Sequence, residues 1–156
     1  MLTAYFSTPL GLARIVGDES GIASISILED GVASESIPDV LQVAVSEIEA
    51  YFAGSRTNFS FAINPIGTDF QKKVWNELLN IPFGKTMSYL ALSKTLGDVK
   101  AIRAVASANG RNPLWIVVPC HRVIGTDGSL TGYAGGLWRK QWLLEHENPS
   151  QQQTLF

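Results

Sequence analysis

The sequence is poor in residues that form disulfides or hold metals. Cys120 is the only cysteine, and His121 and His146 are the only histidines. One thiol cannot form an internal disulfide, and it cannot supply the several sulfur ligands of a structural zinc site. We therefore expect neither a metal nor a cofactor. A single free thiol is compatible with a reducing compartment.

Long apolar runs are also missing. No stretch reaches the roughly 18 apolar residues that a membrane span needs. The start, Met1-Leu2-Thr3-Ala4, lacks the basic residues and long apolar run of a signal peptide. We therefore expect a cytoplasmic protein without membrane contact. Hydrophobic residues still make up 46% of the 156 positions, which predicts a globular chain with a buried core.

The small net charge of −2 hides an uneven distribution. Residues 1–84 carry four basic and ten acidic side chains, whereas residues 85–122 carry six basic side chains and one acidic side chain, Asp98. Residues 123–156 carry two basic and three acidic ones. A basic segment can attract phosphate groups even in an acidic protein. An ordinary solvated helical face is the alternative, and the charges alone leave both interpretations open.

The N-terminal part predicts a small α/β unit. Alternating apolar residues at 12–16 and 22–28 indicate strands, which glycines separate. The spacing of apolar residues after Pro38 predicts a helix that ends before Gly54. Residues 58–63 predict one more strand, and the turn that follows marks our expected domain boundary.

The next part predicts helices with clear start and stop signals. Thr68 and Gln71 have the spacing of a capping box, in which each side chain bonds to the other residue's backbone N–H. A second helix is predicted from Ser88 to Leu96, and a third from its cap Asp98 to Asn109. The two short helices have the outline of a helix-turn-helix.

The third predicted helix has unusually small side chains around Lys100 and Arg103. Such residues let a helix approach another surface closely, and a narrow DNA groove is one such surface. A tightly packed protein core is the alternative, and Ile102 and Val105 suit a buried stripe. The small residues are Ala101, Ala104, Ala106, Ser107 and Ala108.

The thiol follows a continuous apolar run. Residues 115–118 predict a buried strand that stops at Pro119, and Cys120 is followed by His121 and Arg122. Cations near a thiol favour the reactive thiolate, and histidine can take the proton. A buried inert cysteine is the alternative. Neighbouring side chains on a strand point apart, so the histidine helps only if the chain bends there, which Pro119 could cause.

The segment from Pro119 to Val123 resembles the acceptor motif of the O6-alkylguanine-DNA alkyltransferases, or methylated-DNA–protein-cysteine methyltransferases. The resemblance extends from about residue 66 to residue 147 with its spacing kept, and residues 1–63 are similar in outline only. The other matching segments are 82–86, 88–89, 112–113, 133–137 and 142–147.

The resemblance implies an α/β (α+β) fold. We expect a small ribonuclease-H-like N-terminal α/β domain at residues 1–64. A mainly helical, winged helix-turn-helix-like C-terminal domain should follow at residues 65–148, and then a flexible tail at residues 149–156. The family acts as a monomer on double-stranded DNA that contains alkylated guanine, and we expect the same here.

The resemblance also implies roles for individual residues. Cys120 would take the alkyl group from O6-alkylguanine, and from O4-alkylthymine as a further substrate, in one irreversible turnover. His121 would accept the thiol proton through a water, and Glu147 would orient His121. Tyr89 would help to rotate the nucleotide out of the helix and polarise the base, while Arg103 would fill the vacated space.

Further positions are implied by the same resemblance. Lys100, Ala104 and Arg111 would contact DNA together with Tyr89 and Arg103. Trp115 lies at a pocket-wall position where some relatives have proline, which predicts a preference for small alkyl groups. Ala134 stands where many relatives have serine. The guanine pocket would be formed by Asn112, Trp115, Val123, Tyr133 and Ala134.

The last five residues, Gln152 to Phe156, resemble the peptide by which bacterial repair proteins dock on the sliding clamp, and a frayed terminus is the alternative. Other functions also remain open. A lesion binder without transfer activity would lack the cysteine, so the presence of Cys120, His121 and Glu147 argues against it. A winged-helix regulator and a cysteine hydrolase are the remaining alternatives.

Overall fold

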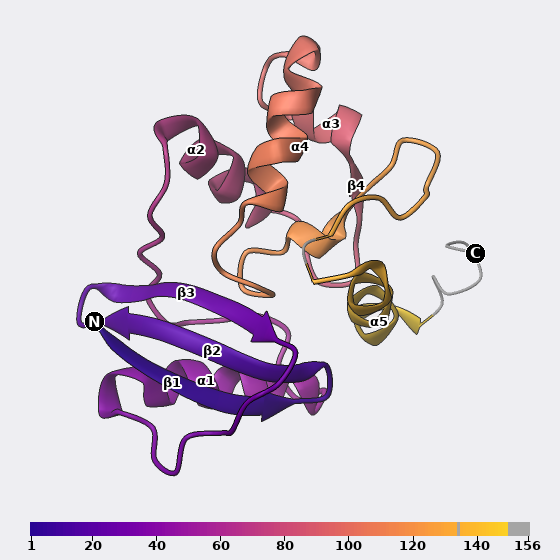
Figure 1. Ribbon diagram of the computed structural model, residues 1–156. Helices are drawn as coiled ribbons and strands as arrows, with labels where there is room; N and C mark the ends of the chain where they lie inside the picture. The colour runs from indigo at the N-terminus through magenta and orange to yellow at the C-terminus, as the bar shows by residue number, and fades with distance from the viewer. Residues whose placement is uncertain (134, 150–156) are drawn as a thin grey trace. The chain divides into compact units, whose positions relative to one another are not determined.

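The computed structural model describes residues 1–133 and 135–149 (Figure 1). The chain forms two compact units. The first contains Met1–Ile66 together with Pro113–Val117, and the second contains Gly67–Asn112 together with the chain from Val118 onward. The boundary that we predicted after residue 64 lies close to this division. The return of residues 113–117 to the first unit was not predicted.

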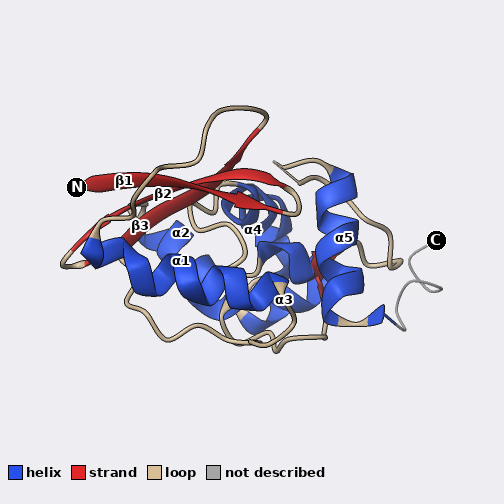
Figure 2. Cartoon of the chain, turned by 90° about the horizontal axis from the view of Figure 1, so that it is seen from below, coloured by secondary structure: helices blue, strands red, loops and turns tan. Residues whose placement is uncertain are grey.

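The first unit is an antiparallel sheet covered by one helix. Strands β1 (Leu2–Thr8), β2 (Gly11–Asp18) and β3 (Gly21–Leu28) pair in sequence order. Helix α1 (Asp39–Phe52) packs along β1 and β2 on one face of the sheet (Figure 2). The apolar periods of these elements explain this core, whose fully buried members include Ile15, Ile25, Leu41, Ile48 and Tyr51.

The strand predicted at residues 58–63 is wrong. This segment makes a single bridge, between Ile63 and Ile22. The Glu47 carboxylate on α1 accepts hydrogen bonds from the Ser60 backbone N–H at 2.8 Å and from the Ser60 hydroxyl. The Glu47 side chain therefore bonds to the Ser60 N–H, which a neighbouring strand would otherwise have used, although the residue pattern suits a strand.

The strand predicted at residues 115–118 is wrong as well. Leu114 bridges Ile25 of β3, and the chain then turns. Ile116 has a φ of 71°, and the Val117 N–H donates to the Trp115 carbonyl at 2.9 Å, which together form a γ-turn. All these side chains are buried. Burial requires only apolar residues, so the composition could not distinguish a buried turn from a buried strand.

The second unit is mainly helical. Its helices are α2 (Asp69–Leu78), α3 (Tyr89–Thr95), α4 (Ile102–Gly110) and α5 (Leu137–Glu147). Helix α4 packs against both α2 and α3 (Figure 1). No helix among the described residues is long and apolar enough to cross a membrane.

The predicted helix starts are confirmed. The Gln71 N–H donates to the Thr68 hydroxyl at 3.1 Å, and the Thr68 N–H donates to the Gln71 side chain at 3.0 Å, which completes the capping box. Ser88 caps α3. Asp98 caps a short 3₁₀ turn, Val99–Ala101, which leads into α4. The third predicted helix is therefore two joined segments.

Two short parallel strands bring distant parts of the second unit together. Strand β4 (Met87–Ser88) precedes α3, and strand β5 (Val123–Ile124) follows the short 3₁₀ turn Cys120–Arg122. Met87 pairs with Val123, and Ser88 pairs with Ile124. This pairing holds the chain around the thiol beside the start of α3, where Tyr89 lies.

Candidate active site

The chain bends sharply at the cysteine. Pro119 has φ −82° and ψ 63°, and the Cys120 N–H donates to the Val118 carbonyl at 2.8 Å, which is an inverse γ-turn. Cys120, His121 and Arg122 then form a 3₁₀ turn. Their side chains leave a helical turn rather than alternate as on a strand. The bend that the sequence required is therefore present.

A buried histidine–glutamate pair lies next to the thiol. His121 is completely buried, Glu147 is 7% exposed and Cys120 is 8% exposed. The His121 Nε2 atom lies 2.7 Å from Oε2 of Glu147, which α5 supplies from 26 positions away. His121 Nδ1 is buried and has no hydrogen-bond partner among the described residues. The carboxylate therefore holds one ring nitrogen and leaves the other available.

Arg122 fixes the carboxylate from the other side. Its Nε donates to Glu147 Oε1 at 2.7 Å, and its Nη2 donates to Oε2 at 3.0 Å. Its Nη1 donates to the Ile81 carbonyl at 2.7 Å. Bidentate pairing of this kind sets the orientation of a carboxylate. The sequence analysis did not assign this role to Arg122, because nothing in its position indicated a bond to residue 147.

Burial and pairing set the protonation states of this pair. Burial lowers the pKa of His121 and outweighs the opposing charge of Glu147. Burial would raise the pKa of Glu147, but the charges and hydrogen bonds of His121 and Arg122 outweigh it and hold this pKa well below its ordinary range. The histidine is therefore neutral and the glutamate ionised near neutral pH. Since the carboxylate accepts a hydrogen bond from Nε2–H, that nitrogen keeps the proton of the neutral ring and Nδ1 is left as a base.

The thiol is less acidic than an exposed one. Burial raises the pKa of Cys120, and a hydrogen bond from Asn112 together with the charge of Lys140 acts in the opposite direction. The Asn112 amide also donates to the Val118 carbonyl at 2.7 Å. Asn112 therefore contacts both the thiol and the turn that carries it, close to where the sequence placed it.

Tyr89 lies in the same cluster. The Asn109 Nδ2 atom is 3.4 Å from the Tyr89 hydroxyl and 3.5 Å from the Cys120 carbonyl. Burial raises the pKa of Tyr89, so its hydroxyl stays protonated and can donate. The sequence analysis missed Asn109, which has the character of an ordinary residue near a helix end.

Lys140 on α5 was missed too, although the sequence contains a signal for it. It is completely buried, and it lies three, four and seven positions before Leu143, Leu144 and Glu147. These spacings place all four residues on one helix face. A lysine on the apolar face that also carries a predicted site residue is unusual, and that combination could have identified it.

A hollow of about 470 Å³ lies between the start of α3, helix α4 and the loop that follows β5. Its lining includes Tyr89 and Arg103, two residues predicted to contact DNA. The remaining lining residues are small or apolar, and they are Ile102, Ala106, Gly110, Gly125, Thr126, Thr131 and Gly132. Lys100, Ala104 and Arg111, also predicted to contact DNA, are exposed on or beside α4.

The residues predicted to form the guanine pocket are divided between the two units. Val123 is fully buried in β5 and Tyr133 is half-buried in the second unit. Trp115 belongs to the first unit, where its ring lies 6.0 Å from that of Phe52. Ala134 and the segment from Gln152 to Phe156 lie outside the described residues.

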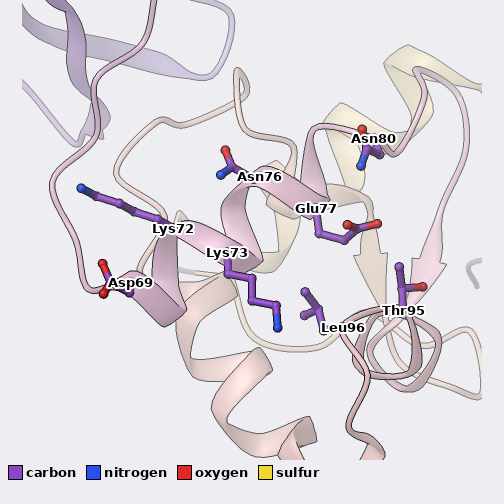
Figure 3. Close-up of a pocket in the computed structure, with 8 residues that line it drawn as sticks. All are labelled: Asp69, Lys72, Lys73, Asn76, Glu77, Asn80, Thr95 and Leu96. Carbon is purple, nitrogen blue, oxygen red and sulfur yellow. The ribbon is translucent and has the colours of Figure 1, made fainter.

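A second hollow, also of about 470 Å³, lies along α2 and the end of α3 (Figure 3). It contains none of the predicted site residues. Its lining mixes charges of both signs, and it consists of Asp69, Lys72, Lys73, Asn76, Glu77, Asn80, Thr95 and Leu96.

The fold and the site together define a class. A helical unit holds a buried thiol beside a neutral histidine and an ionised glutamate, with a hollow nearby. This is the arrangement of a protein that uses cysteine as a nucleophile, with a base and an orienting carboxylate.

The comparisons with known proteins give the family. Residues 1–65 match the ribonuclease-like domain of 6-O-methylguanine DNA methyltransferase, and residues 69–149 match its DNA-binding domain. The chain belongs to the 6-O-methylguanine DNA methyltransferase family. The family predicted from the acceptor motif is therefore confirmed.

Individual relatives agree along most of their length. A methylated-DNA–protein-cysteine methyltransferase of Methanosarcina acetivorans is 44% identical over 154 residues, which cover 94% of this chain and 98% of the relative. One of Mycobacterium tuberculosis is 43% identical over 145 residues, which cover 90% and 88%. These relatives carry the enzyme name that the resemblance implied.

Solved structures are similar too. The O6-methylguanine methyltransferase of Mycobacterium tuberculosis has a TM-score of 0.83 at 41% identity, covering 95% of this chain and 94% of that one. The crystal structure of Mycobacterium tuberculosis OGT in complex with DNA has a TM-score of 0.85 at 42% identity, covering 94% and 93%. The predicted fold class is therefore confirmed.

Proposed function

We propose that this protein repairs DNA directly by transferring the alkyl group of O6-alkylguanine to Cys120. The observation that carries the proposal is the buried pair of His121 and Glu147 at 2.7 Å beside the chain's only thiol. Membership of the 6-O-methylguanine DNA methyltransferase family supports the substrate. The negative charge of Glu147 stabilises the positive charge that His121 gains when it takes the thiol proton.

The proton and the electrons can be followed through the step. Glu147 accepts a hydrogen bond from the Nε2–H of His121, which keeps that proton on Nε2 and leaves Nδ1 to take the thiol proton, directly or through a water. The new bond joins the Cys120 sulfur to the alkyl carbon as the bond from that carbon to O6 breaks. The bonding pair leaves with the guanine, and a proton delivered to the purine restores its neutral form. Tyr89, whose hydroxyl stays protonated, would polarise the purine.

Each molecule should react once. The product is a thioether, in which sulfur is a very poor leaving group. A thioether also has no S–H proton that His121 could remove, so the sulfur cannot be activated again. Since the alkyl group then stays on Cys120, the transfer should be stoichiometric. The same chemistry would apply to O4-alkylthymine, which offers an alkyl carbon on a comparable oxygen.

The base must leave the duplex first, because a stacked alkyl group cannot reach a thiol that is 8% exposed. Turning a nucleotide out costs a few kcal/mol, and less at a damaged pair. Arg103 is exposed on α4 at the edge of the hollow, where it could take the vacated space. Lys100, Ala104 and Arg111 would contact the neighbouring backbone.

The direct test uses a duplex with one O6-methylguanine, mixed with the whole protein, and measures the intact mass. We expect the protein to gain one methylene unit, since methyl replaces the thiol proton, and to do so once. Cys120→Ser should gain nothing, and a matched duplex with ordinary guanine should transfer nothing. Tight binding to the damaged duplex without a mass change would instead indicate a lesion binder, and equal binding to both duplexes a regulator.

Two narrower proposals rest on the sequence resemblance. A preference for small alkyl groups is tied to Trp115, and reaction with O6-benzylguanine as fast as with O6-methylguanine would contradict it. Docking of Gln152–Phe156 on a sliding clamp is the other. Deleting Leu155 and Phe156 should abolish clamp binding, and unchanged binding would contradict this proposal. Apart from such docking, we expect the protein to be monomeric.

A further inference from the structure

Helix α5 buries a lysine that the mechanism above does not use. Lys140 is completely buried, and it shares a helix face with Glu147. Removing an ammonium group from water is costly unless an opposite charge compensates it. Among the residues that the structure describes, no carboxylate forms an ion pair with Lys140. Its charge therefore requires another explanation.

The surroundings of Lys140 lead to the thiol. Its Nζ donates to the Thr131 carbonyl at 2.9 Å and lies 5.9 Å from the centre of the Tyr89 ring. The Tyr89 hydroxyl and the Cys120 carbonyl in turn share Nδ2 of Asn109, at 3.4 Å and 3.5 Å. Lys140, Tyr89 and Cys120 are thus parts of one cluster, in which Lys140 and Cys120 are buried and Tyr89 is half-buried.

The other charged groups near Cys120 are already neutralised. Arg122 and Glu147 pair with each other through two hydrogen bonds, and His121 is held neutral by burial. Tyr89 stays protonated because burial raises its pKa. Lys140 therefore supplies the uncompensated positive charge of the cluster, and a thiolate at Cys120 is the negative charge that would match it.

We propose that Lys140 is a positioning residue whose buried charge stabilises the Cys120 thiolate. The proposal rests on Cys120 being the alkyl acceptor. Lys140 keeps its own proton, and His121 remains the group that removes the thiol proton. The charge pair exists while sulfur is anionic and disappears when the neutral thioether forms.

The mutual influence of the two groups supports this placement. Burial raises the pKa of Cys120, and the charge of Lys140 lowers it again. Burial lowers the pKa of Lys140 to about 8, and Cys120 acts against that shift. Lys140 is therefore still mostly protonated at pH 7, which is the state that the proposal needs.

A purely structural role would be to hold the loop that lines the hollow. Arg139 provides a matched control, because it is also buried on α5 and its Nη1 donates to the loop carbonyl of Gly135 at 2.7 Å. Its guanidinium lies over the Trp138 ring at 4.5 Å, rather than over Tyr89. Losing Arg139 should loosen the loop without removing the charge that faces the thiol.

The experiment measures the reactivity of the thiol without DNA. Whole protein is treated with iodoacetamide from pH 6 to pH 10, and the intact mass reports alkylation of Cys120, with Cys120→Ser as the blank. We expect Lys140→Met to raise the midpoint of the profile by about one pH unit, a loss of about tenfold in rate at pH 7. Lys140→Arg should restore most of the loss, and Arg139→Met should keep the wild-type midpoint.

Two results would overturn the proposal. One is a Lys140→Met midpoint equal to that of the wild type, and the other is an equal shift in Arg139→Met, which would reduce Lys140 to a support for the loop. Thermal unfolding establishes that each variant is folded, and Lys140→Gln replaces Lys140→Met in the same comparison if the latter does not fold. Failure of the wild type to gain mass from methylated DNA would contradict the proposed function alone, since the iodoacetamide profile does not depend on it.

Discussion

Each of the two units buries one glutamate and binds it with an arginine, yet the two arrangements differ. Glu47 in the first unit is 8% exposed, bonds to Ser60 and pairs with the half-exposed Arg56 at 3.2 Å. Glu147 in the second unit is 7% exposed and pairs with the buried Arg122 and with His121. The first carboxylate fastens a loop to a helix, and the second holds an imidazole beside a thiol.

The difference lies in what the carboxylate organises. The first unit buries mostly apolar side chains, and Glu47 satisfies backbone and hydroxyl donors in a segment that forms no strand. The second unit buries five ionisable side chains besides Cys120, which are His121, Arg122, Arg139, Lys140 and Glu147. Burying so many ionisable groups weakens a fold unless each is paired. We infer that chemistry, rather than stability, explains the second arrangement.

The largest expected effect comes from Glu147→Gln. The change leaves Arg122 buried without its charge partner, which should lower the free energy of unfolding by about 3–5 kcal/mol. It also removes the group that keeps His121 in the right tautomer, so alkyl transfer per folded molecule should slow by about 10²–10⁴-fold. Urea unfolding and single-turnover transfer measure the two losses. A folded variant with the wild-type transfer rate would contradict the role of Glu147 in orienting His121.

The next largest effect is expected for an exposed arginine of the second unit. Arg103→Ala on α4 should weaken binding to a methylated duplex by about 1–3 kcal/mol, which is the range for an arginine that contacts DNA closely. Arg14→Ala, an equally exposed arginine on β2, should leave binding unchanged. Fluorescence anisotropy at fixed salt compares the two variants. Equal losses would mean that both units contact DNA.

A smaller effect is expected from Glu47→Gln, the same substitution in the first unit. It weakens charged hydrogen bonds to Ser60 and the pair with Arg56, so the free energy of unfolding should fall by about 1–3 kcal/mol. Transfer per folded molecule should not change, because the variant leaves every group around Cys120 in place. Slowed transfer with intact folding would contradict the division of roles between the two glutamates.

The pH dependence of stability gives the smallest effect. The pKa of His121 is lowered by burial, so below its ordinary value of about 6.5 the unfolded chain binds a proton that the folded chain does not. Stability should therefore fall with pH below that value, by at most about 1.4 kcal/mol per pH unit for one proton. The wild type should show this slope, and His121→Gln should flatten it. Urea unfolding at pH 7, 6 and 5 tests both.

Local signals explain what could be predicted of the fold. The capping box at Thr68, the cap at Ser88 and the glycine stops act within a few residues, so the helix starts followed from the sequence. The strands expected at 58–63 and 115–118 did not form. The apolar residues at 115–118 are buried in tight turns. Residues 58–63 stay exposed or half-buried, and there the Ser60 N–H bonds to the Glu47 side chain while the Ala62 carbonyl accepts from Ile22.

Some residues of the candidate site could be predicted from the sequence and others could not. Cys120, His121 and Glu147 could be named because the acceptor motif and its spacing are contained in the sequence. Asn109 and Arg122 could not, because their importance depends on which distant groups they meet. Lys140 had a signal, its place on the apolar face of α5, but only the fold shows that it lies near Tyr89.

Residue type and short or fixed spacing were enough to establish the family and the helix caps and to predict the nucleophile. Only the tertiary structure decided that the thiol lies on a bend, that one arginine and one histidine share a carboxylate, and that a lysine charge is sealed in with them. The physical reason is that burial and electrostatic pairing are properties of side chains brought together from far apart in the chain.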